Sequence, residues 1–460
     1  MLYPPDVVDS PSWVDWGWAG RPRRPPAVRA PSHATVFDII AFATAVAMIM
    51  IYTQCWLMAL QGDKPGATDS PLVRAMFFPA YAGGMLLLAL SPGQTLRAWL
   101  RQPVLIIILW IVAASVIWSI TPAESLRRVV ALIMTTLGGV VIAARWRWPG
   151  LAEVIATAHA ILAAISLMAV VAVPHFGVMH ELFPGAWRGL WTEKNTLGIN
   201  MTIGFVACAA AGLLEPRRRR LWVAAACLCL VLLLGSTSKT SLVSCLLGGC
   251  GLVLVVIVRR GPVGRIVGTY AAVTAALLLG LGLLTASDLF LAVLGKDATL
   301  TGRTKIWAGV MNRIQERPWL GYGYEAVWTD TDPWAPLAWI TKQSGFRAYH
   351  AHNSWLEQWL GLGVLGLSAW ALYFLEVWTR ALIALYRSAG AYLAIPFLLV
   401  YSLTTLTESV ALVFNDSRWL IFVAVAAKLA LPPDPASDPA LGPHAGTRRE
   451  SISPAVRSVA

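Results

Sequence analysis

The amino-acid sequence predicts an all-α, polytopic integral membrane protein with about twelve transmembrane helices. Its 460 residues are 57% hydrophobic and 13% charged, and the mean hydropathy is +0.64. Apolar runs recur along the chain at lengths near the roughly 20 residues that a helix needs to cross a bilayer. This combination excludes an ordinary soluble globular domain.

Twelve apolar segments can be read in order, and each is expected to form one span. They cover residues 36–60, 74–91, 103–119, 128–144, 151–173, 195–214, 221–236, 239–258, 265–285, 355–379, 391–408 and 418–431. The residues before position 35 show no signal-peptide pattern, so the first apolar segment is expected to stay in the membrane. The predicted organisation is a cytoplasmic segment, spans 1 to 9, an extracytoplasmic loop, spans 10 to 12 and a disordered cytoplasmic tail rich in Pro, Ala, Asp and Ser, at residues 1–35, 36–285, 286–354, 355–431 and 432–460.

The basic residues predict the orientation of the spans. With a cytoplasmic N-terminus, every even-numbered connection is cytoplasmic, and each carries arginine: Arg97, Arg101, Arg145, Arg147, Arg217 to Arg220, Arg259, Arg260, Arg265, Arg380 and Arg387. Cytoplasmic loops are enriched in Lys and Arg, so both termini are predicted to lie inside. The net charge of +12 follows from this pattern and does not indicate nucleic acid. The six cysteines all fall inside apolar runs, where they are expected to act as small core hydrophobes.

Two outward segments, residues 174–194 and 286–354, are too long to be plain turns. The second contains "RPWLGYGYEAVW" and "DPWAPLAWI", which hold more Trp and Tyr than a solvated linker needs. Trp and Tyr are favoured at the membrane interface. This loop is therefore expected to fold back against the membrane surface.

Arg303 lies at the start of an amphipathic helix predicted in "TGRTKIWAGVMNRIQERP". Trp307, Val310, Met311 and Ile314 follow helical spacing, Thr301 suits an N-cap and Pro318 ends the helix. A guanidinium in the first turn is unfavourable for the helix dipole, and free N–H groups there attract anions. Arg303 is therefore a candidate residue for binding an anionic ligand.

Two further outward segments carry basic residues next to small or polar ones. Arg188, in "FPGAWRGLWTEKNTLG", precedes Lys194 and Asn195; it is either an interfacial anchor or a ligand-binding residue. Lys239, in "LLLGSTSKTSLVS", lies among hydroxyl groups at the membrane surface, where an unpaired charge is costly. The alternative is that Lys239 forms a purely structural ion pair with Glu357 or Glu408.

The stretch "SGFRAYHAHNSWLEQWLGLG" gathers titratable and charged groups at the start of an apolar helix. His352 begins the tenth span, and Asn353 could orient a ligand or cap the helix. Arg347, His350 and Glu357 flank them. A metal site is discounted because no nearby Cys, Asp or third His completes a ligand set. A histidine facing several arginines favours a base beside a phosphate-bearing substrate, although a histidine bonded to a carbonyl at a helix start remains the alternative. His350 is expected to be structural.

Four motifs together resemble the O-antigen ligase and polymerase superfamily. They are "WRGLWTEKNTLG", "GSTSKTSLVS", "TGRTKIW" followed by "RPWLGYGY", and "AHNSWLEQWLGLGVLGL", which span about residues 185–370. The segments "EKNTLG", "SKTS" and "ERPWLGYGY" are most similar in sequence to the exopolysaccharide-production polymerase branch.

The resemblance implies a GT-C-like glycosyltransferase that needs no metal or other cofactor. Its donor would be an undecaprenyl-diphosphate-linked oligosaccharide and its acceptor a glycan. The protein would lie among the lipids of the bacterial inner membrane, with its active site on the periplasmic face and with other polysaccharide export or assembly proteins as partners. The expected reaction is an inverting transfer that polymerises repeat units.

The family's site residues carry over position by position. Its loop histidine falls on His352 as the catalytic group, and its loop arginine in a Gly-Arg motif falls on Arg303 after Gly302. Its arginine before the sixth span falls on Arg188. Lys239 stands where many ligases have arginine, which agrees with the polymerase branch. Arg188, Arg303 and Lys239 would bind the diphosphate, supported by Lys194, Asn195, Gly302, Arg347, Asn353 and Glu357.

Two rival functions remain open from the sequence. A ligase would pass the same lipid-linked glycan to lipid A core or to a protein, and it would share the donor site. A secondary transporter would also have about twelve spans, but it should show repeated halves with matching broken spans. No such symmetry is visible, so the transporter is the weaker rival.

Overall fold

The computed structural model describes residues 35–62, 70–181, 183–285, 303–329 and 332–432. The predicted N-terminal segment up to residue 34, Thr301, Gly302 and the predicted tail from residue 433 lie outside the described residues. Residues from Ala41 onward form one compact unit, and the description below concerns that unit.

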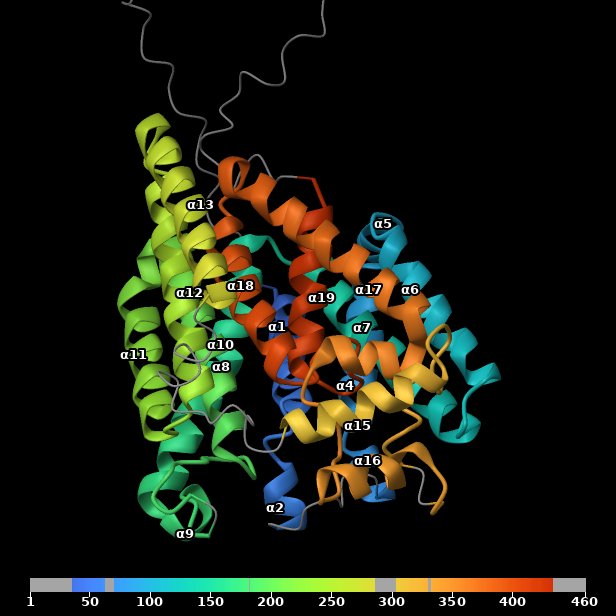
Figure 1. Ribbon diagram of the computed structural model, residues 1–460. Coiled ribbons are helices and arrows are strands. Elements are labelled where there is room, and N and C mark those ends of the chain that lie inside the picture. The colour runs from blue at the N-terminus through green and yellow to red at the C-terminus, as the bar shows by residue number, and fades with distance from the viewer. Residues whose placement is uncertain (1–34, 63–69, 182, 286–302, 330–331, 433–460) are drawn as a thin grey trace, which may run out of the picture. The chain divides into compact units, whose positions relative to one another are not determined.

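The described residues are helical, with one isolated antiparallel bridge between Val178 and Trp187. Figure 1 shows the helices, and their bounds in the first half of the chain are α1 Val36–Tyr52, α2 Leu57–Gln61, α3 Pro71–Ala75, α4 Phe78–Leu90, α5 Pro92–Leu100, α6 Pro103–Ala114, α7 Pro122–Arg145, α8 Trp148–Ala172, α9 Pro174–Gly177 and α10 Lys194–Leu214. The remaining helices are α11 Arg219–Gly235, α12 Lys239–Val258, α13 Pro262–Thr285, α15 Arg303–Glu316, α16 Pro336–Ser344, α17 Ser354–Arg387, α18 Ala391–Thr407 and α19 Ser417–Ala430.

The protein is a multi-pass membrane protein with six or seven candidate spans among its described residues. Six helical stretches are long and apolar enough to cross a bilayer, namely Pro71–Leu90, α7, α8, α10, α12 and α17. The pair Pro92–Leu100 and Pro103–Ile117 makes a seventh if its 85° bend lies within one span. Each of the twelve predicted apolar segments coincides with a helix, but several of these helices are short. In the first segment, for example, α1 ends at Tyr52 and Gln54 adopts a left-handed φ of +57°, which no helix can continue through.

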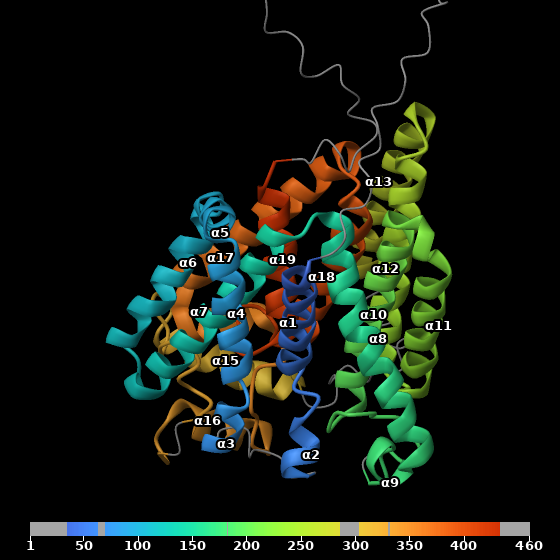
Figure 2. The ribbon, with the colours of Figure 1, turned by 180° about the vertical axis from the view of Figure 1, so that it is seen from behind.

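Small residues let the helices approach closely. A Cβ on Gly139 of α7 would lie 2.6 Å from the Leu420 carbonyl oxygen of α19, and Gly248 of α12 faces Val400 of α18. Close approach at small residues is typical of helix packing in membranes. Figure 2 shows the same helices from behind, with α2, α3 and α9 at one end of the helices that they adjoin.

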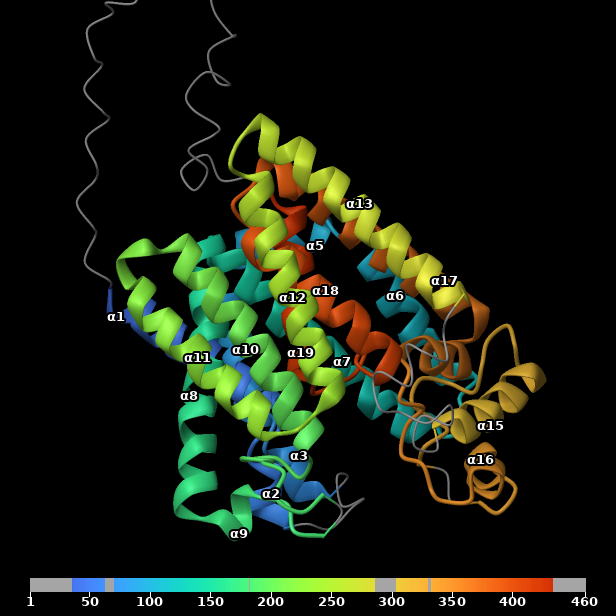
Figure 3. The ribbon, with the colours of Figure 1, turned by 60° about the vertical axis from the view of Figure 1, so that its left-hand side comes forward.

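The described parts of the segment that precedes α17, residues 303–329 and 332–353, contain two helices, and the position of this segment against a membrane surface stays a prediction. α15 packs against α16 and α17, and its buried face consists of Ile306, Val310 and Ile314. The predicted helix is therefore confirmed. Trp307 lies at the edge of the buried face, and its Nε1 donates to the Ala351 carbonyl at 2.9 Å. Figure 3 shows α15 and α16 side by side.

Candidate functional site

His352 is held at the mouth of α17 by the helix cap that follows it. Asn353 Oδ1 accepts hydrogen bonds from Trp355 N at 2.9 Å and Leu356 N at 3.2 Å, so Asn353 is the N-cap. His352 itself has a left-handed φ of +50°, and its Nδ1 lies 2.9 Å from Glu408 Oε2. Glu408 directly follows α18, so two helix ends supply the pair.

Arg303 completes the cluster from the start of α15. Its Nη2 lies 2.7 Å from Glu408 Oε1, and its Nη1 donates to the Thr407 carbonyl at 2.5 Å. The unfavourable position of an arginine in a first helical turn is thus compensated by a carboxylate of the same chain. Binding of an external anion by Arg303 stays a prediction.

The electrostatics of this cluster favour an ionised Glu408. Burial alone would raise its pKa, but the hydrogen bond from His352 and the charge of Arg303 outweigh burial and lower the pKa of Glu408 to about 2. Burial is the main cause that lowers the pKa of His350 to about 3, and the neighbouring His352 adds to the effect. His350 is therefore neutral at physiological pH, and its structural role stays a prediction.

An ionised Glu408 determines the tautomer of His352. A carboxylate only accepts hydrogen bonds, so the Nδ1 that faces Glu408 must carry the proton. In the neutral ring, Nε2 then holds the free lone pair. A carboxylate that orients the ring in this way is the usual partner of a catalytic histidine. This arrangement makes Nε2 a suitable proton acceptor.

A buried carboxylate, Glu357, ties the loop of His352 to the segment of Glu408. It accepts hydrogen bonds from Ala351 N at 2.8 Å, from Ser409 Oγ at 2.9 Å and from Trp328 Nε1. Ala351 precedes His352 and Ser409 follows Glu408, so one side chain fixes both. This geometry fits the supporting role expected for Glu357, and that role stays a prediction.

Ser354, in the first turn of α17, makes a second link of the same kind. Its Oγ donates to the Glu408 carbonyl at 2.8 Å and accepts from Val410 N at 2.9 Å.

The cluster also brings together three groups that could hold a metal ion by distance alone. One ligand atom each from His350, His352 and Glu408 lies within 4.8 Å of the others. However, Arg303 already pairs with the carboxylate, and the charge of Arg418 acts on both His350 and Glu408. Two nearby cations disfavour a third, so the hydrogen-bonded pair fits this cluster better than a metal centre does.

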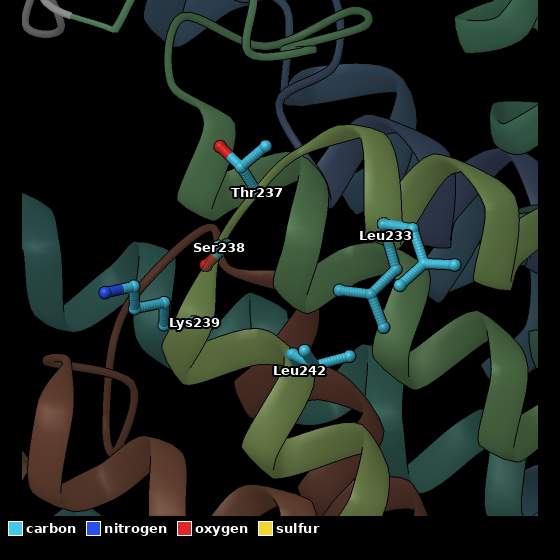
Figure 4. Close-up of a pocket in the computed structure, with 6 residues that line it drawn as sticks. Leu233, Thr237, Ser238, Lys239 and Leu242 are labelled. Carbon is cyan, nitrogen blue, oxygen red and sulfur yellow. The ribbon is translucent and has the colours of Figure 1, made fainter. Parts of the chain in front are cut away.

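A second polar cluster lies where α10 and α12 begin. Lys194 Nζ lies 3.4 Å from Thr237 Oγ1, and Ser238 Oγ donates to Asn195 Oδ1 at 2.9 Å. Next to these groups is a cavity of about 210 Å³, lined by Leu233, Leu234, Thr237, Ser238, Lys239 and Leu242. Figure 4 shows the amine of Lys239 pointing away from the leucines, so the cavity has an apolar wall and a cationic edge.

Helix packing places this second cluster at the level of the first. α12 packs against α18, with Gly248 against Val400 and Gly251 against Leu399 and Pro396. Lys239 is nine residues before Gly248, and Glu408 is eight residues after Val400. In this antiparallel pair, about equal lengths of helix bring Lys239 and Glu408 to the same end.

Arg188 has a different environment from the other predicted ligands. Its side chain is buried, Nε donates to the Phe176 carbonyl at 2.9 Å, and Nη2 lies 3.4 Å from the His175 carbonyl. These bonds hold the short helix α9, while Trp187 N donates to the Gly235 carbonyl at 2.9 Å and ties the segment to α11. Diphosphate binding by Arg188 stays a prediction. So does a supporting role for Arg347, which is exposed and lies over the Tyr349 ring.

The sequence did not predict Glu408 and Arg418 as site residues. From the sequence, Glu408 is expected only as a structural partner of Lys239, and only Cys, Asp and His are expected as further metal ligands. The available signal was a carboxylate directly after an apolar run, "LTTLTESV". Arg418 Nη2 pairs with Asp416 Oδ2 at 2.5 Å at the start of α19.

Comparison with known proteins finds one family that matches part of this chain. Residues 224–371, which contain α12, α15 and the loop of His352, match the family described as O-antigen ligase. This segment is similar to the O-antigen ligase family. The resemblance expected from the motifs is therefore confirmed, and the match includes Lys239, Arg303, His352 and Glu357, whereas Arg188 and Glu408 lie outside it.

A relative supports the same assignment. The chain is 31% identical over 204 residues to the exopolysaccharide production protein ExoQ of Rhizobium meliloti. The alignment covers 42% of this chain and 46% of ExoQ, so the two match over less than half of their lengths.

Proposed function

We propose that this protein is a membrane glycosyltransferase that polymerises lipid-linked repeat units into an exopolysaccharide. The hydrogen bond between His352 Nδ1 and Glu408 Oε2 is the observation that carries the proposal, because it leaves Nε2 able to accept a proton. The name of the relative, an exopolysaccharide production protein, favours polymerisation as the outcome.

The cavity beside Lys239 supports a lipid-linked donor. Three leucines form its apolar wall, and Lys239, with Thr237 and Ser238, gives it a polar edge. A prenyl diphosphate has the same division between an apolar chain and an anionic head. A cavity of about 210 Å³ is large enough only for the isoprene units nearest the diphosphate. The remainder of the chain would lie in the bilayer.

The proposed reaction uses these groups in the following way. The acceptor hydroxyl attacks the anomeric carbon, a new C–O bond forms, and the bond from that carbon to the diphosphate oxygen breaks. The lipid diphosphate leaves with the bonding electron pair, and His352 Nε2 takes the hydroxyl proton. Lys239, Arg188 and the N–H groups of Arg303 that are bound to neither Glu408 nor Thr407 stabilise the leaving group, each by about 3 kcal/mol in a site with little water. Attack opposite the leaving group inverts the anomeric centre.

The membrane topology belongs to the same proposal. Twelve crossings in a GT-C-like arrangement would put both termini in the cytoplasm and the clusters of His352 and Lys239 on the periplasmic face of the bacterial inner membrane. The ends of α1 and α18 and the starts of α10, α12 and α17 would then share one side. The donor would be an undecaprenyl-diphosphate oligosaccharide, and the export machinery for the polymer would act next.

A second candidate function is ligation of the same glycan to lipid A core or to a protein. The matched family is described as O-antigen ligase, which favours this alternative. The donor site would be unchanged, so only the acceptor distinguishes the two reactions.

The test is complementation of a deletion strain with wild type, His352→Ala, Arg303→Ala or Lys342→Ala at matched membrane levels. Lys342 is the control because it is exposed and lies over Trp339. Polymerisation predicts that the His352 and Arg303 variants accumulate single lipid-linked units while Lys342→Ala makes normal polymer. Long polymer retained on its carrier lipid would indicate a ligase. Normal glycan in all three strains would exclude the proposed site.

A further inference from the structure

A second cavity, of about 140 Å³, lies where the end of α1 meets the starts of α10 and α19. At about 30 Å³ for each water molecule, it has room for four or five waters, which is the scale of one six-membered sugar ring. Its walls combine aromatic and polar side chains, among them Tyr52, Gln54, Trp191, Thr196, Asn200 and Arg418.

Asn200 is the wall residue with an unmet hydrogen-bonding need. Its Nδ2 donates to the Thr196 carbonyl at 2.9 Å, but its buried Oδ1 has no hydrogen-bond partner in the described part of the chain. A buried acceptor without a partner is costly, so this residue is unfavourable for stability alone. Because Oδ1 has almost no exposed surface, a ligand hydroxyl in the cavity would donate to it only after the Asn200 amide turns toward the cavity.

Arg418 lies in the part of the cavity wall that follows Glu408 in the sequence. Its guanidinium lines the cavity and is paired with Asp416 through Nε, at 3.0 Å from both carboxylate oxygens. The charge of Arg418 also acts on Glu408 and His350. The segment from Ser409 to Asp416 joins the two places, because it follows Glu408, ends beside Arg418, and is tied to the first turn of α17, where Ser354 Oγ accepts from Val410 N at 2.9 Å.

We propose that this cavity binds one pyranose ring of the acceptor glycan and so presents its hydroxyl to His352. The inference rests on the proposed function and assigns its acceptor subsite. A free or lipid-bound phosphate fits less well, since Asp416 neutralises Arg418. A lipid tail fits less well too, because Asn200, Thr196 and Gln54 would lose hydration without gaining hydrogen bonds. A neutral ring with several hydroxyls satisfies the polar groups, and its apolar face can pack on Trp191 or Tyr52.

The experiment measures glycan binding separately from transfer. The full chain is purified in lipid nanodiscs, and neutral oligosaccharides released from the host's own polysaccharide by mild acid are titrated in by calorimetry. Asn200→Leu keeps the shape and removes the unpartnered acceptor. The control Asn312→Leu makes the same change on the exposed face of α15, where Asn312 Nδ2 bonds Gln343 Oε1. Thr196→Val, a second change in the wall, covers the case in which Asn200→Leu does not fold.

The expected result is that Asn200→Leu, or Thr196→Val, weakens oligosaccharide binding about fivefold to tenfold, as loss of one hydrogen bond should. Asn312→Leu should bind as wild type does. In transfer assays, Asn200→Leu should raise the KM for acceptor and leave kcat and the KM for donor unchanged.

Two results would overturn the subsite: undiminished binding by both wall variants, or no binding by wild type. Failure of the proposed function has a different signature, because His352→Ala would then transfer normally whatever the binding data show.

Discussion

His352 Nδ1 lies 2.9 Å from Glu408 Oε2, although 56 residues separate them in the sequence. Glu408 also pairs with Arg303, which is 105 residues away. One carboxylate therefore orients the imidazole and neutralises the arginine. Because the proton on Nδ1 depends on this carboxylate, the proposed base cannot be understood from its own loop alone.

Glu408→Gln should lower kcat by about a hundredfold or more with little change in the KM for donor. An amide can present its NH₂ group to Nδ1, which favours the wrong imidazole tautomer, as loss of the carboxylate does in serine proteases. The measurement is transfer in nanodiscs at matched protein levels. Glu376→Gln is the control, since it breaks a comparable ion pair with Arg380, of 2.6 Å, elsewhere on α17. A Glu408→Gln enzyme as fast as the control would exclude the orienting role.

Glu357→Ala should destabilise the protein and reduce transfer together. The change leaves the buried Ala351 N–H without its acceptor and releases Ser409, at a cost of about 1–3 kcal/mol for each buried group. Glu357→Gln keeps one acceptor oxygen and should recover part of both properties. Thermal unfolding in detergent and transfer rate are measured side by side. Normal stability with lost transfer would instead mean that Glu357 acts directly on substrate.

His350→Asn should weaken the loss of stability that acid causes in wild type. The pKa of His350 is about 3 in the folded protein, below its ordinary value of 6.5, so the unfolded state binds its proton first. This residue's contribution to stability is complete above pH 6.5 and is lost as the pH falls towards 3. His352, Glu408, Arg303 and Arg418 surround the ring, and Asn can still accept the 3.3 Å bond from His352 N.

The measurement is the unfolding midpoint at pH 7 and at pH 5 in detergent. The variant should show a smaller difference than wild type, and His175→Asn, which changes an exposed histidine, should leave the difference unchanged. Equal differences in all three proteins would contradict the assignment.

Chelation with excess EDTA should leave the transfer rate unchanged. Arg303 already neutralises Glu408, so a cation at the histidines would face two arginines without a free carboxylate. Transfer and metal content by mass spectrometry are measured before and after chelation. Loss of activity that a divalent ion restores would show that the three groups form a metal site after all.

The sequence predicts helices well here and predicts their meeting points poorly. Apolar runs locate each helix, and the spacing around Val310 predicts α15, because both depend on local periodicity. The pairing of Glu408 with His352 depends on how α17 and α18 pack, which no local pattern encodes. The number of spans is also hard to predict from apolar runs, because backbone turns such as the one at Gln54 shorten helices inside these runs.

Gly363→Ala should destabilise the protein far more than Gly345→Ala. The motifs "RPWLGYGY" and "WLGLG" form a backbone seam in which Gly323 N donates to the Gly361 carbonyl at 2.8 Å and Val364 N to the Pro318 carbonyl at 2.8 Å. Gly363 kinks α17 at a φ of +66°, and a Cβ there would overlap the Trp319 carbonyl. Alanine must therefore adopt a strained φ and push the two segments apart, at a cost of about 3 kcal/mol or more.

Gly345→Ala introduces the unfavourable backbone φ without a steric clash. It ends α16 at a φ of +85° with no atom near its Cβ position, so alanine there should cost only about 1 kcal/mol. Thermal unfolding of both variants in detergent gives the comparison. Because the seam holds α17, whose first turn follows His352, Gly363→Ala should also lose transfer at temperatures where it is still folded, and Gly345→Ala should not. Equal stability of the two variants would mean that the seam opens without cost, and that the two glycine motifs position nothing.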